Sequence, residues 1–400
     1  MPGLGSLSYI QIVPEAAYGY GTPAATQKLE IVSANISPVI GVIQDPSLYN
    51  AQSRRGIFQG GQLWRGSFTF RMNYAGLLEF LRGSFGTYTS PTVEAGVLDH
   101  TFKEGSTLKT YRIEMVEGNV SNTKCQTLVG AKFTGITVKG TAGTGNDAMI
   151  MLEVTVIAKD KLVDQTPTTS LSFPSVLPVL FHQNITTSDG TIDGGVNSVS
   201  VVNCSASSST TLTRAAGNFT TDGVRAGMGI SGTGIPANTT VVSVGTTTLV
   251  MSAAGGAGAS LTMVFLTALR VRSFEVSLDS PHTEDRFYMG ALNIDEPLRS
   301  DFIVARWRLT QEFANVNLLN AAKAFTTGAP KIIFQHGTTI GAASKREFEL
   351  RSGSANLVEF SAPIEGYGVI IATSTWEAWL DGTDASALVA RVRNTETALP

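Results

Sequence analysis

Two short stretches of this 400-residue chain have residue types that could do chemistry. The first, Gly227 to Gly232, fits the G-x-G-x-x-G pattern of dinucleotide-binding turns. Such a site needs a helix directly after the glycines, because the helix N-terminus meets the phosphates. Here Gly234 and Pro236 follow within four residues and argue against a helix. We therefore interpret these glycines as turn residues.

The second stretch runs from Asp279 to Asp285 and holds His282 between acidic side chains. A metal site or an acid–base pair would use such groups. A solvated turn is favoured, because no second histidine or acidic cluster stands at helix or strand spacing from this stretch. The other histidines are scattered along the chain: His100, His182 and His336. The sequence also has no P-loop, H-E-x-x-H or G-x-S-x-G motif, so we expect no catalysis, no metal and no cofactor.

Two further pairs of residues are candidates for binding. Arg54 and Arg55 could hold a phosphate group, but a pair of arginines in a long loop more often contacts another protein. Trp376 and Trp379 are three residues apart and would face opposite sides of a strand. That spacing favours one core residue and one interface residue over a sugar-binding platform.

The composition argues against several classes of protein. Lys and Arg number 29 against 32 Asp and Glu, which is not the basic excess of a dedicated nucleic-acid clamp, although DNA could still pass nearby. Cys125 and Cys204 stand too far apart for a C-x-x-C motif or a zinc ligand set. The longest apolar run, around Leu261–Leu269, is too short for a membrane helix. Since Met1–Gly5 does not begin a signal peptide, we expect a soluble protein made in the cytoplasm.

The first part of the chain predicts mostly strands. Residues 1–28 read as an extended arm, and Leu29–Ile36 as a strand that ends at Ser37-Pro38. A long loop over residues 41–62 follows, and loops of this length are usually functional or ordered by a partner. Leu63–Met72 alternates between apolar and polar residues, which is a strong strand signal.

A helix is expected after Asn73, with three leucines on its inner face and with Gly83 and Gly86 at its end. The leucines are Leu77, Leu78 and Leu81. Further strands are expected over residues 108–117, 127–140 and 148–158, and a Thr/Pro/Ser linker over 164–175.

The two outer parts of the chain resemble each other at a fixed shift of 243 residues. The matches are Ser37-Pro38 with Ser280-Pro281, Trp64-Arg65 with Trp307-Arg308, and Phe70 with Phe313. The second helix is expected at Asn315–Phe325, with Val316, Leu319 and Phe325 facing inward. Each copy ends in a strand, at Ala148–Ala158 or Val369–Leu380. Two similar halves, with Trp64, Phe70, Trp307 and Phe313 as the core of the repeated motif, are favoured over one irregular α+β domain.

Residues 193–268 differ in composition from both halves. They contain few charged residues and are rich in Ser, Thr, Gly, Ala and Val, which predicts a small, separate, outward-facing β domain. We therefore expect a first half-domain over 1–165, a linker with the first strands of the second half over 166–192, the insert, and the rest of the second half with a C-terminal arm over 269–400.

Several segments carry a family resemblance: Gln62–Phe70 running into Gly76–Leu81, Leu180–Gln183 leading to Asp189-Gly190, Val271–Asp279, Asp285–Phe287 and Pro297–Arg299. Together they resemble the tail tube proteins, or major tail proteins, of long-tailed bacteriophages, over most of the chain outside the insert. The chain departs from simple members of that family because it is doubled and carries the insert.

The resemblance implies a mainly β (α+β) fold. Two antiparallel β-sandwich or half-barrel domains, each with a flanking helix, would join those of neighbouring subunits into a closed β-barrel ring. Stacked rings would form the tail tube of the virion, assembled in the host cytoplasm, and double-stranded DNA would pass through the lumen without specific binding. The implied protein is structural, with no enzymatic activity, cofactor or membrane association. Further implied partners are the tape measure, terminator and distal tail proteins.

Because the chain holds two such subunits, we expect a homotrimeric, pseudo-hexameric ring, with a homohexamer as the alternative. We expect the loops 41–62 and 283–301 to bridge rings through aromatic and arginine side chains. These are Tyr49, Arg54, Arg55, Phe58, Arg286, Phe287 and Tyr288. The alternative function is a capsid decoration or tail adhesin protein that binds a host-surface glycan through the insert. A carbohydrate-active enzyme is disfavoured, because no pair of carboxylates has a supporting context.

Overall fold

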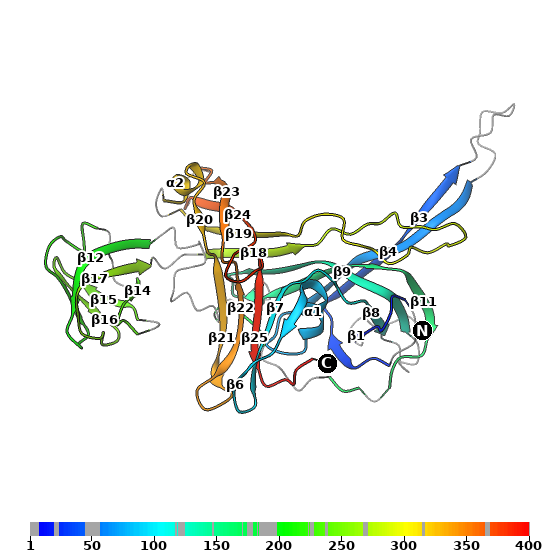
Figure 1. Ribbon diagram of the computed structural model, residues 1–400, viewed down its shortest axis with the longest axis horizontal. Helices are drawn as coiled ribbons and strands as arrows, with labels where there is room; N and C mark the ends of the chain where they lie inside the picture. The colour runs from blue at the N-terminus through cyan, green and yellow to red at the C-terminus, as the bar shows by residue number, and fades with distance from the viewer. Residues whose placement is uncertain are drawn as a thin grey trace.

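The structure is a computed structural model that describes residues 8–399 with gaps. Outside the described residues lie 1–7, 20–23, 45–56, 117, 119–124, 146–147, 170, 174–178, 182, 184–197, 223, 225–227, 237–238, 267–270, 314–316, 365–368 and 400. The described chain is built almost entirely of antiparallel strands, with two short helices, α1 (Leu78–Phe85) and α2 (Asn317–Lys323) (Figure 1). The prediction of a mainly β, antiparallel fold is confirmed.

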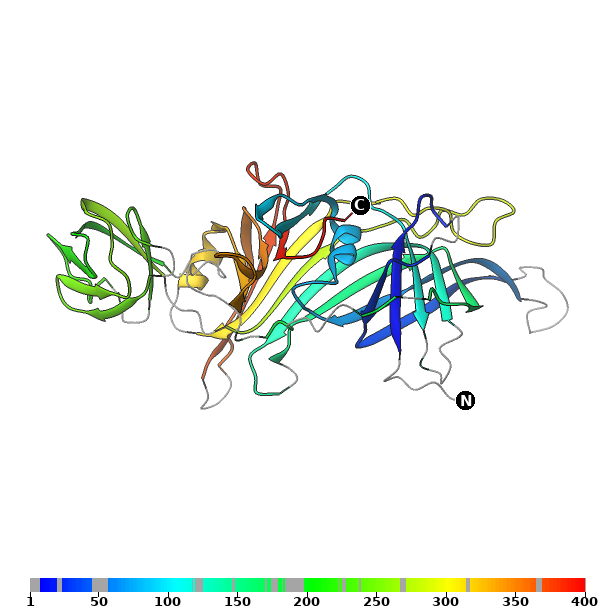
Figure 2. The same ribbon diagram turned by 90° about the horizontal axis from the view of Figure 1, so that it is seen from below.

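Eight strands form one continuous surface, which we call the wall. In order across the sheet they are β3 (Ser33–Gln44), β4 (Ile57–Arg71), β10 (Met151–Ala158), β9 (Cys125–Thr141), β18 (Val271–Asp279), β19 (Val304–Glu312), β24 (Ile371–Ala378) and β23 (Ala355–Ser361). Every neighbouring pair in this row is antiparallel. Figure 2 shows the long strands of the wall side by side, as a curved surface.

One face of the wall is apolar because side chains alternate along each strand. In β4, Phe68 and Phe70 are fully buried, whereas Arg65 points to the opposite face. In the second half, Trp307 of β19 lies directly opposite Trp376 of β24, and both indole rings are fully buried. Because directly opposite residues share a face, these large side chains gather in one core.

The same strand order occurs twice in the wall. In the first half, the hairpin β3–β4 leads through α1 to the hairpin β9–β10, and β10 returns to pair with β4. In the second half, β18–β19 leads through α2 to β23–β24, and β24 returns to pair with β19. Helix α1 contacts β9, and α2 contacts the corresponding strand β23. The pairings of β9 with β10 and of β23 with β24 each contain an irregularity that adds one residue, which increases the local twist.

A second sheet covers the apolar face of the wall. Its order is β21 (Lys331–Thr339), β22 (Lys345–Arg351), β25 (Val389–Asn394), β7 (Val97–Glu104) and β5 (Gly86–Thr89), with β6 (Thr92–Glu94) also paired to β7. The rings of Phe274 in the wall and Phe334 in β21 are 5.7 Å apart and mark the contact between the layers. Because β25 lies between β22 and β7, the last strand of the chain ties the two halves together in this outer layer.

Only the later part of strand β9 belongs to the wall, where it pairs with β10 and β18. Its first part belongs to a further group of strands. That part pairs with β8 (Tyr111–Val116) and β11 (Asp160–Gln165), and β8 continues to β1 (Tyr9–Pro14) and β2 (Gln27–Glu30). The remaining short strand, β20 (Thr327–Gly328), pairs with the beginning of β23. Buried side chains from both halves form a single hydrophobic cluster.

The inserted segment has its own sheet and its own core. The strands are β12 (Ser198–Ala206), β13 (Thr211–Arg214), β14 (Gly229–Gly232), β15 (Val241–Val244), β16 (Thr248–Met251) and β17 (Gly258–Leu266), in the order β14-β17-β12-β13-β16-β15. Its cluster of buried residues shares no member with the cluster of the two halves. In Figure 1 these strands lie at the far left, apart from the wall. Its hydrophobic core is thus separate from the main one.

The prediction that a strand ends at Ser37-Pro38 is wrong, since β3 continues to Gln44. The loop prediction for residues 41–62 is wrong in part for the same reason, because β3 and β4 extend into it from both sides. A proline fits inside β3 because β3 is an edge strand. The Met72 N–H donates to the Ile150 carbonyl, so even-numbered β4 residues turn their backbone groups toward β10 and away from β3. Pro38 lies opposite Trp64, and its nitrogen, which has no hydrogen, therefore faces the free edge.

The predicted match between the two Ser-Pro pairs is also wrong. Pro38 lies opposite Trp64, whereas the residue opposite Trp307 is Val276. The shift of 243 aligns Pro38 with Pro281 in the sequence, but in the structure the position of Pro38 corresponds to Val276. The repetition in the wall rests on strand order and on the Trp-Arg strands.

The three leucines predicted on the inner face of α1 are all buried, with Leu77 directly before the first residue of the helix, but α2 differs from its prediction. It spans Asn317–Lys323 and buries Leu318 and Ala321. Leu319 is only half-buried, and Phe325 is 61% exposed with φ at 51°, beyond the end of the helix. The inward orientation predicted for Phe325 is therefore wrong, Leu319 faces inward only in part, and the predicted Val316 lies outside the described residues.

Gly83 lies inside α1 rather than at its end, and only Gly86 terminates the helix. A Cβ atom on Gly83 would lie 2.3 Å from a ring carbon of Phe133 and 2.6 Å from one of Tyr111. Both rings are fully buried and stacked, with centroids 5.0 Å apart. The glycine thus allows α1 to approach β9 closely.

We predict that Gly83→Ala destabilises the chain by about 1–2 kcal/mol, measured by denaturant unfolding. Alanine gains about 1 kcal/mol of helix propensity over glycine, but overpacking costs about 1–3 kcal/mol, and a contact this short puts the cost at the upper end. The matched control is Gly337→Ala in β21, where an added Cβ meets nothing within 4 Å and a change under about 0.5 kcal/mol is expected. Equal stability of the two variants would contradict the close approach.

Candidate assembly surfaces

The wall ends in two unpaired strand edges. Among the described residues, β3 pairs only with β4, and β23 pairs with β24 and, at Ala355 and Asn356 alone, with β20. Apolar side chains stand exposed along both edges: Ile40 is 48% exposed, Val42 58% and Ile364, just past β23, 79%. Unpaired backbone groups beside exposed apolar side chains mark an edge that another strand can join.

The middle of the wall shows how two such edges are joined. There β9, the last strand of the first half in the row, pairs with β18, the first strand of the second half. The paired residues run from Gly135 opposite Asp279 to Thr141 opposite Ser273. We call this pairing the internal seam. Since both halves have the same strand order, β23 and β3 are the second-half and first-half counterparts of the two seam strands.

The face of the wall opposite the core is polar; we call it the polar face. Its charges are mixed in sign, from Arg65, Arg71, Lys139, Arg306 and Arg308 to Glu153, Glu275, Asp279 and Glu377. Several of these groups pair with one another, for example Lys139 with Glu153 at 3.0 Å and Arg306 with Glu377 at 3.6 Å. A surface of paired charges has no excess of cations to hold a polyanion.

The segment between β18 and β19 crosses one end of the polar face. Lys132 donates to the Pro297 carbonyl at 2.9 Å and pairs with Glu296 at 2.6 Å. The Gln62 N–H donates to the Leu292 carbonyl, and the Gln62 carbonyl accepts from Ile294. A hollow of about 600 Å³ lies at this end, lined by polar groups of β3, β4, β10 and the end of β18. The predicted loop over 283–301 therefore exists, and this chain itself orders it.

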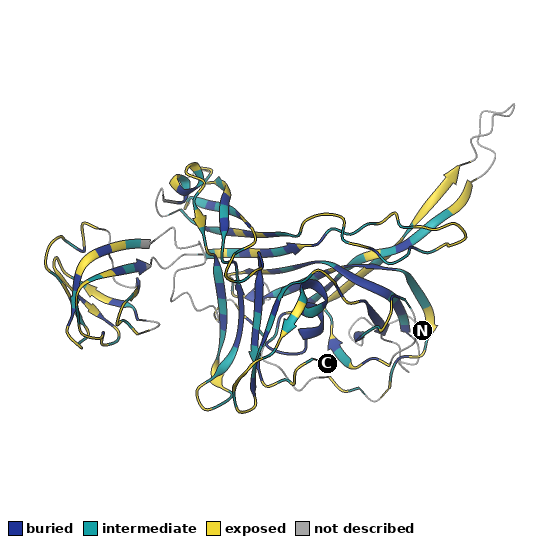
Figure 3. Cartoon of the chain, in the orientation of Figure 1, coloured by how far each residue is buried: buried dark blue, intermediate teal, exposed yellow. Residues whose placement is uncertain are grey.

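The β3–β4 hairpin and this segment project toward the same end of the molecule (Figure 1). Figure 3 shows the projecting part of the hairpin mostly as exposed surface. We call the apolar residues exposed there the hairpin end: Ile43, Ile57, Phe58, Tyr288 and Met289. A projecting group of exposed apolar side chains is typical of a contact surface.

The predicted contact residues differ in their environment. Tyr49, Arg54 and Arg55 lie outside the described residues. Phe58 and Tyr288 are 59% and 60% exposed.

Two further predicted contact residues are held within the chain. Arg286 pairs with Asp295 at 3.2 Å and donates to the Tyr288 hydroxyl at 3.0 Å. The Phe287 ring lies over Gly61, where a Cβ atom would be 2.6 Å from it. Arg286 and Phe287 therefore shape the segment, while its exposed neighbours remain available for contacts.

The residues expected at the core of the repeated motif do not have equivalent burial. Phe70 and Trp307 are fully buried, and Trp64 is half-buried. Phe313 lies just beyond β19, half-buried, with its ring 6.2 Å from that of Phe360. In the C-terminal pair, Trp376 is buried and Trp379 is 51% exposed, on opposite sides as the spacing predicts.

The glycine motif, His282 and the two cysteines, which the sequence offered as candidates for chemistry, lie in a strand, a turn and buried positions. Gly229–Gly232 is strand β14, followed by a turn and not by a helix. The His282 Nδ1–H donates to the Ser280 carbonyl, 2.6 Å away, and burial lowers the pKa of the imidazole. Cys125 and Cys204 are buried free thiols.

Within the described part of the chain, no group of three or more His, Cys, Asp or Glu side chains is arranged to hold a metal ion. None of the helices found there has the length and apolar character needed to cross a membrane.

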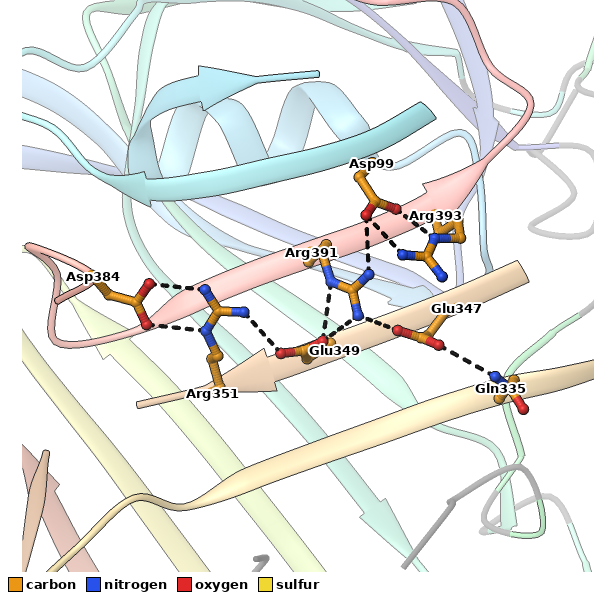
Figure 4. Close-up of polar contacts among 8 residues, drawn as sticks. All are labelled: Asp99, Gln335, Glu347, Glu349, Arg351, Asp384, Arg391 and Arg393. Atoms are coloured by element: carbon orange, nitrogen blue, oxygen red, sulfur yellow. Dashed lines mark hydrogen bonds and ion pairs between the residues drawn. The ribbon is translucent and has the colours of Figure 1, made fainter. Parts of the chain in front are cut away.

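A network of charged side chains, which we call the charge ladder, connects the halves across the outer sheet (Figure 4). Arg391 of β25 pairs with Glu347 and Glu349 of β22 and, at 3.1 Å, with Asp99 of β7. Burial alone would raise the pKa of Glu349, but the Arg391 guanidinium lowers that pKa below its ordinary value. Sequence reasoning missed the ladder, whose signal is the alternation of charged and apolar residues in Lys345–Arg351 and Val389–Asn394.

A family model described as phage tail tube protein matches residues 5–203, which include the first four wall strands and α1. No curated protein sequence matches the chain.

The ladder predicts a stability difference that depends on pH. Arg391→Met leaves the buried carboxylates of Glu347 and Glu349 without their main counterion. We expect the free energy of unfolding to fall by about 3 kcal/mol at neutral pH. This is the lower end of the cost of breaking a buried ion pair, because Arg351 still contacts Glu349. A group with a lowered pKa contributes stability above its unfolded pKa and loses that contribution as the pH falls through its folded pKa. The gap between variant and wild type should therefore narrow below about pH 4.

Chemical denaturation at a series of pH values measures this gap. The control is Arg306→Met, whose partner Glu377 is 3.6 Å away and whose side chains are both about half exposed, so that under about 1 kcal/mol is expected. An Arg391→Met effect as small as that of the control, or one that does not change with pH, would contradict the structural role of the ladder.

Proposed function

Because the chain belongs to the phage tail tube protein family, we propose that its copies close into rings whose stacks form the tail tube of the virion and conduct double-stranded DNA. The observation that carries the proposal is the doubled wall, in which the end of one half already pairs with the start of the other. Repetition of that pairing between chains uses the β23 edge of one copy and the β3 edge of the next. It also covers apolar side chains that one chain leaves exposed.

We propose three chains per ring, and the doubled organisation of the chain supports this number. Each chain supplies two units of four strands, so three chains supply six units with pseudo-six-fold symmetry. Twenty-four strands at about 4.8 Å spacing and about 40° tilt form a barrel with a backbone diameter of about 48 Å. Side chains reduce this to a lumen of about 35–40 Å, by the same geometry, which is wide enough for duplex DNA and water.

The polar face suits the inner surface of such a tube. The outer sheet covers the apolar face, so the polar face is the one left to line the lumen. Its charges are nearly balanced and paired, and tight DNA binding requires an excess of cations that neutralise phosphates. DNA would then slide through without being held.

The remaining parts have roles in this assembly. The separate core of the insert fits a module displayed on the outside of the tube, one per chain. We place tape measure, terminator and distal tail proteins as partners at the ends of the tube. The protein would work as a structural component without catalysis, assembled in the host cytoplasm.

Electron microscopy and native mass spectrometry of the purified protein test the proposal. We expect tubes, with detached rings of three chains and three outer projections per ring. Rings of six chains with six projections would contradict the trimeric ring and support a homohexamer. Monomers or short trimers that never stack, combined with glycan binding through the insert, would favour a decoration or adhesin protein instead.

We also expect the hairpin end to join successive rings. The double variant Phe58→Ser/Tyr288→Ser removes two exposed rings without changing the buried core of the wall, so single rings should form while long tubes become rare. Val250→Ser, which changes an exposed residue of the insert, serves as the control. Tubes of wild-type length and yield from the double variant would show that stacking uses another surface.

A further inference from the structure

The internal seam predicts the register in which two copies of this chain join, a detail that rests on the ring proposed above. To derive this register, each residue of β3 and β23 must be matched to its equivalent in the seam strands β18 and β9. Trp64 of β4 corresponds to Trp307 of β19, and their partners on the returning strands are Ala158 and Trp376. These correspondences place each residue of β3 and β23 on its counterpart in the seam.

On the β3 side, the residue opposite Trp64 is Pro38 and the residue opposite Trp307 is Val276. Pro38 therefore corresponds to Val276, and Ile40 to Leu278. In the internal seam, Val276 pairs with Val138 and Leu278 with Ile136.

On the β23 side, the equivalence of β10 with β24 places Thr155 on Thr373. Their partners on the next strand are Gly135 and Ser361. Counting on from this pair, Ile136 corresponds to Ala362 and Val138 to Ile364.

From these equivalences we infer that β23 of one copy pairs antiparallel with β3 of a second copy, with Phe360 opposite Val42, Ala362 opposite Ile40 and Ile364 opposite Pro38. The partner is therefore another copy of this chain, and the contact is a defined extension of the wall. The residues that meet on the core side of the new pair are all apolar or proline, as they are in the internal seam.

Backbone geometry supports this register. In the internal seam, even-numbered residues exchange the hydrogen bonds, as Ala142 with Arg272 and Ser280 with Thr134 show. In β4, the Met72 N–H donates to Ile150, so even-numbered β4 residues face β10 and their even-numbered partners in β3 face the free edge. The backbone groups of Ile40, which lies before the irregularity in the pairing of β3 with β4, are thus turned toward the incoming strand.

The two prolines near these edges are compatible with the register. Pro38 costs one bond, because its nitrogen faces the new strand without a hydrogen. Pro363 is odd-numbered and, by the equivalence, its nitrogen faces β24 and not the free edge. A shift of one residue would bring the exposed apolar side chains onto the polar face, so the alternation opposes that slip.

Pairs of introduced cysteines test the register in assembled protein. Ile40→Cys with Ala362→Cys are directly opposite, about 5.5 Å apart between Cα atoms, which permits a disulfide. The matched controls are Ile40→Cys with Phe360→Cys and Ile40→Cys with Ile364→Cys, which report a slip of two residues in either direction. The native cysteines are buried, and single-cysteine variants correct for them.

Mild oxidation of assembled tubes should give covalent trimers on non-reducing gels from the Ile40/Ala362 variant, at least tenfold more than from either control. Tubes that cross-link mainly in a control variant, or in none, would overturn the register while leaving the tube proposal intact. Wild-type protein that forms no rings at all would overturn the proposed function itself.

A second variant keeps the test decisive if the cysteine variants do not assemble. Ala362→Pro removes the N–H that the register directs at Ile40 of the next copy, so we expect folded monomers and loss of rings by native mass spectrometry. Ala362→Ser retains the N–H and should form rings like the wild type. Rings of wild-type yield from Ala362→Pro would contradict the seam.

Discussion

The unpaired backbone groups at the two ends of the wall are the constraint on which the rest of this structure depends. A strand edge in water is satisfied only partly, and an edge flanked by exposed apolar side chains favours a partner. The chain satisfies this requirement once within itself, where β9 meets β18, and leaves it unsatisfied at β3 and β23. Closure into a ring would remove both edges, as it does in any barrel.

The internal junction differs from the proposed external one in the outer layer. Inside the chain, β25 lies between β22 and β7, and the charge ladder runs across all three strands. The two halves are therefore fixed to each other by two layers. The edges at β3 and β23 belong to the wall, so in the proposed ring each chain would join the next through a pairing of wall strands.

The polar face and the core side of the wall serve separate purposes because side chains alternate along a strand. Lys139 and Glu153 pair on one face, while Val138 and Leu152 are buried on the other. The same two strands thus contribute to stability and offer a surface of balanced charge. The hairpin end lies beyond the covered part of the wall, where exposed rings such as Phe58 and Tyr288 make no contribution to that core.

The sequence by itself determined the strands whose apolar residues alternate, the buried face of α1 and the different composition of the insert, because periodicity and composition are local properties. It also pointed to the repeated Trp-Arg strands. It did not determine where β3 ends, because Pro38 is tolerated only on an edge strand, and edge position is a property of the sheet. The orientation of Phe325 depended on where α2 ends. The pairing of β9 with β18, the pairing of β25 with β7 and the contact of Arg391 with Asp99 join residues more than 100 positions apart, so only the tertiary structure decided them.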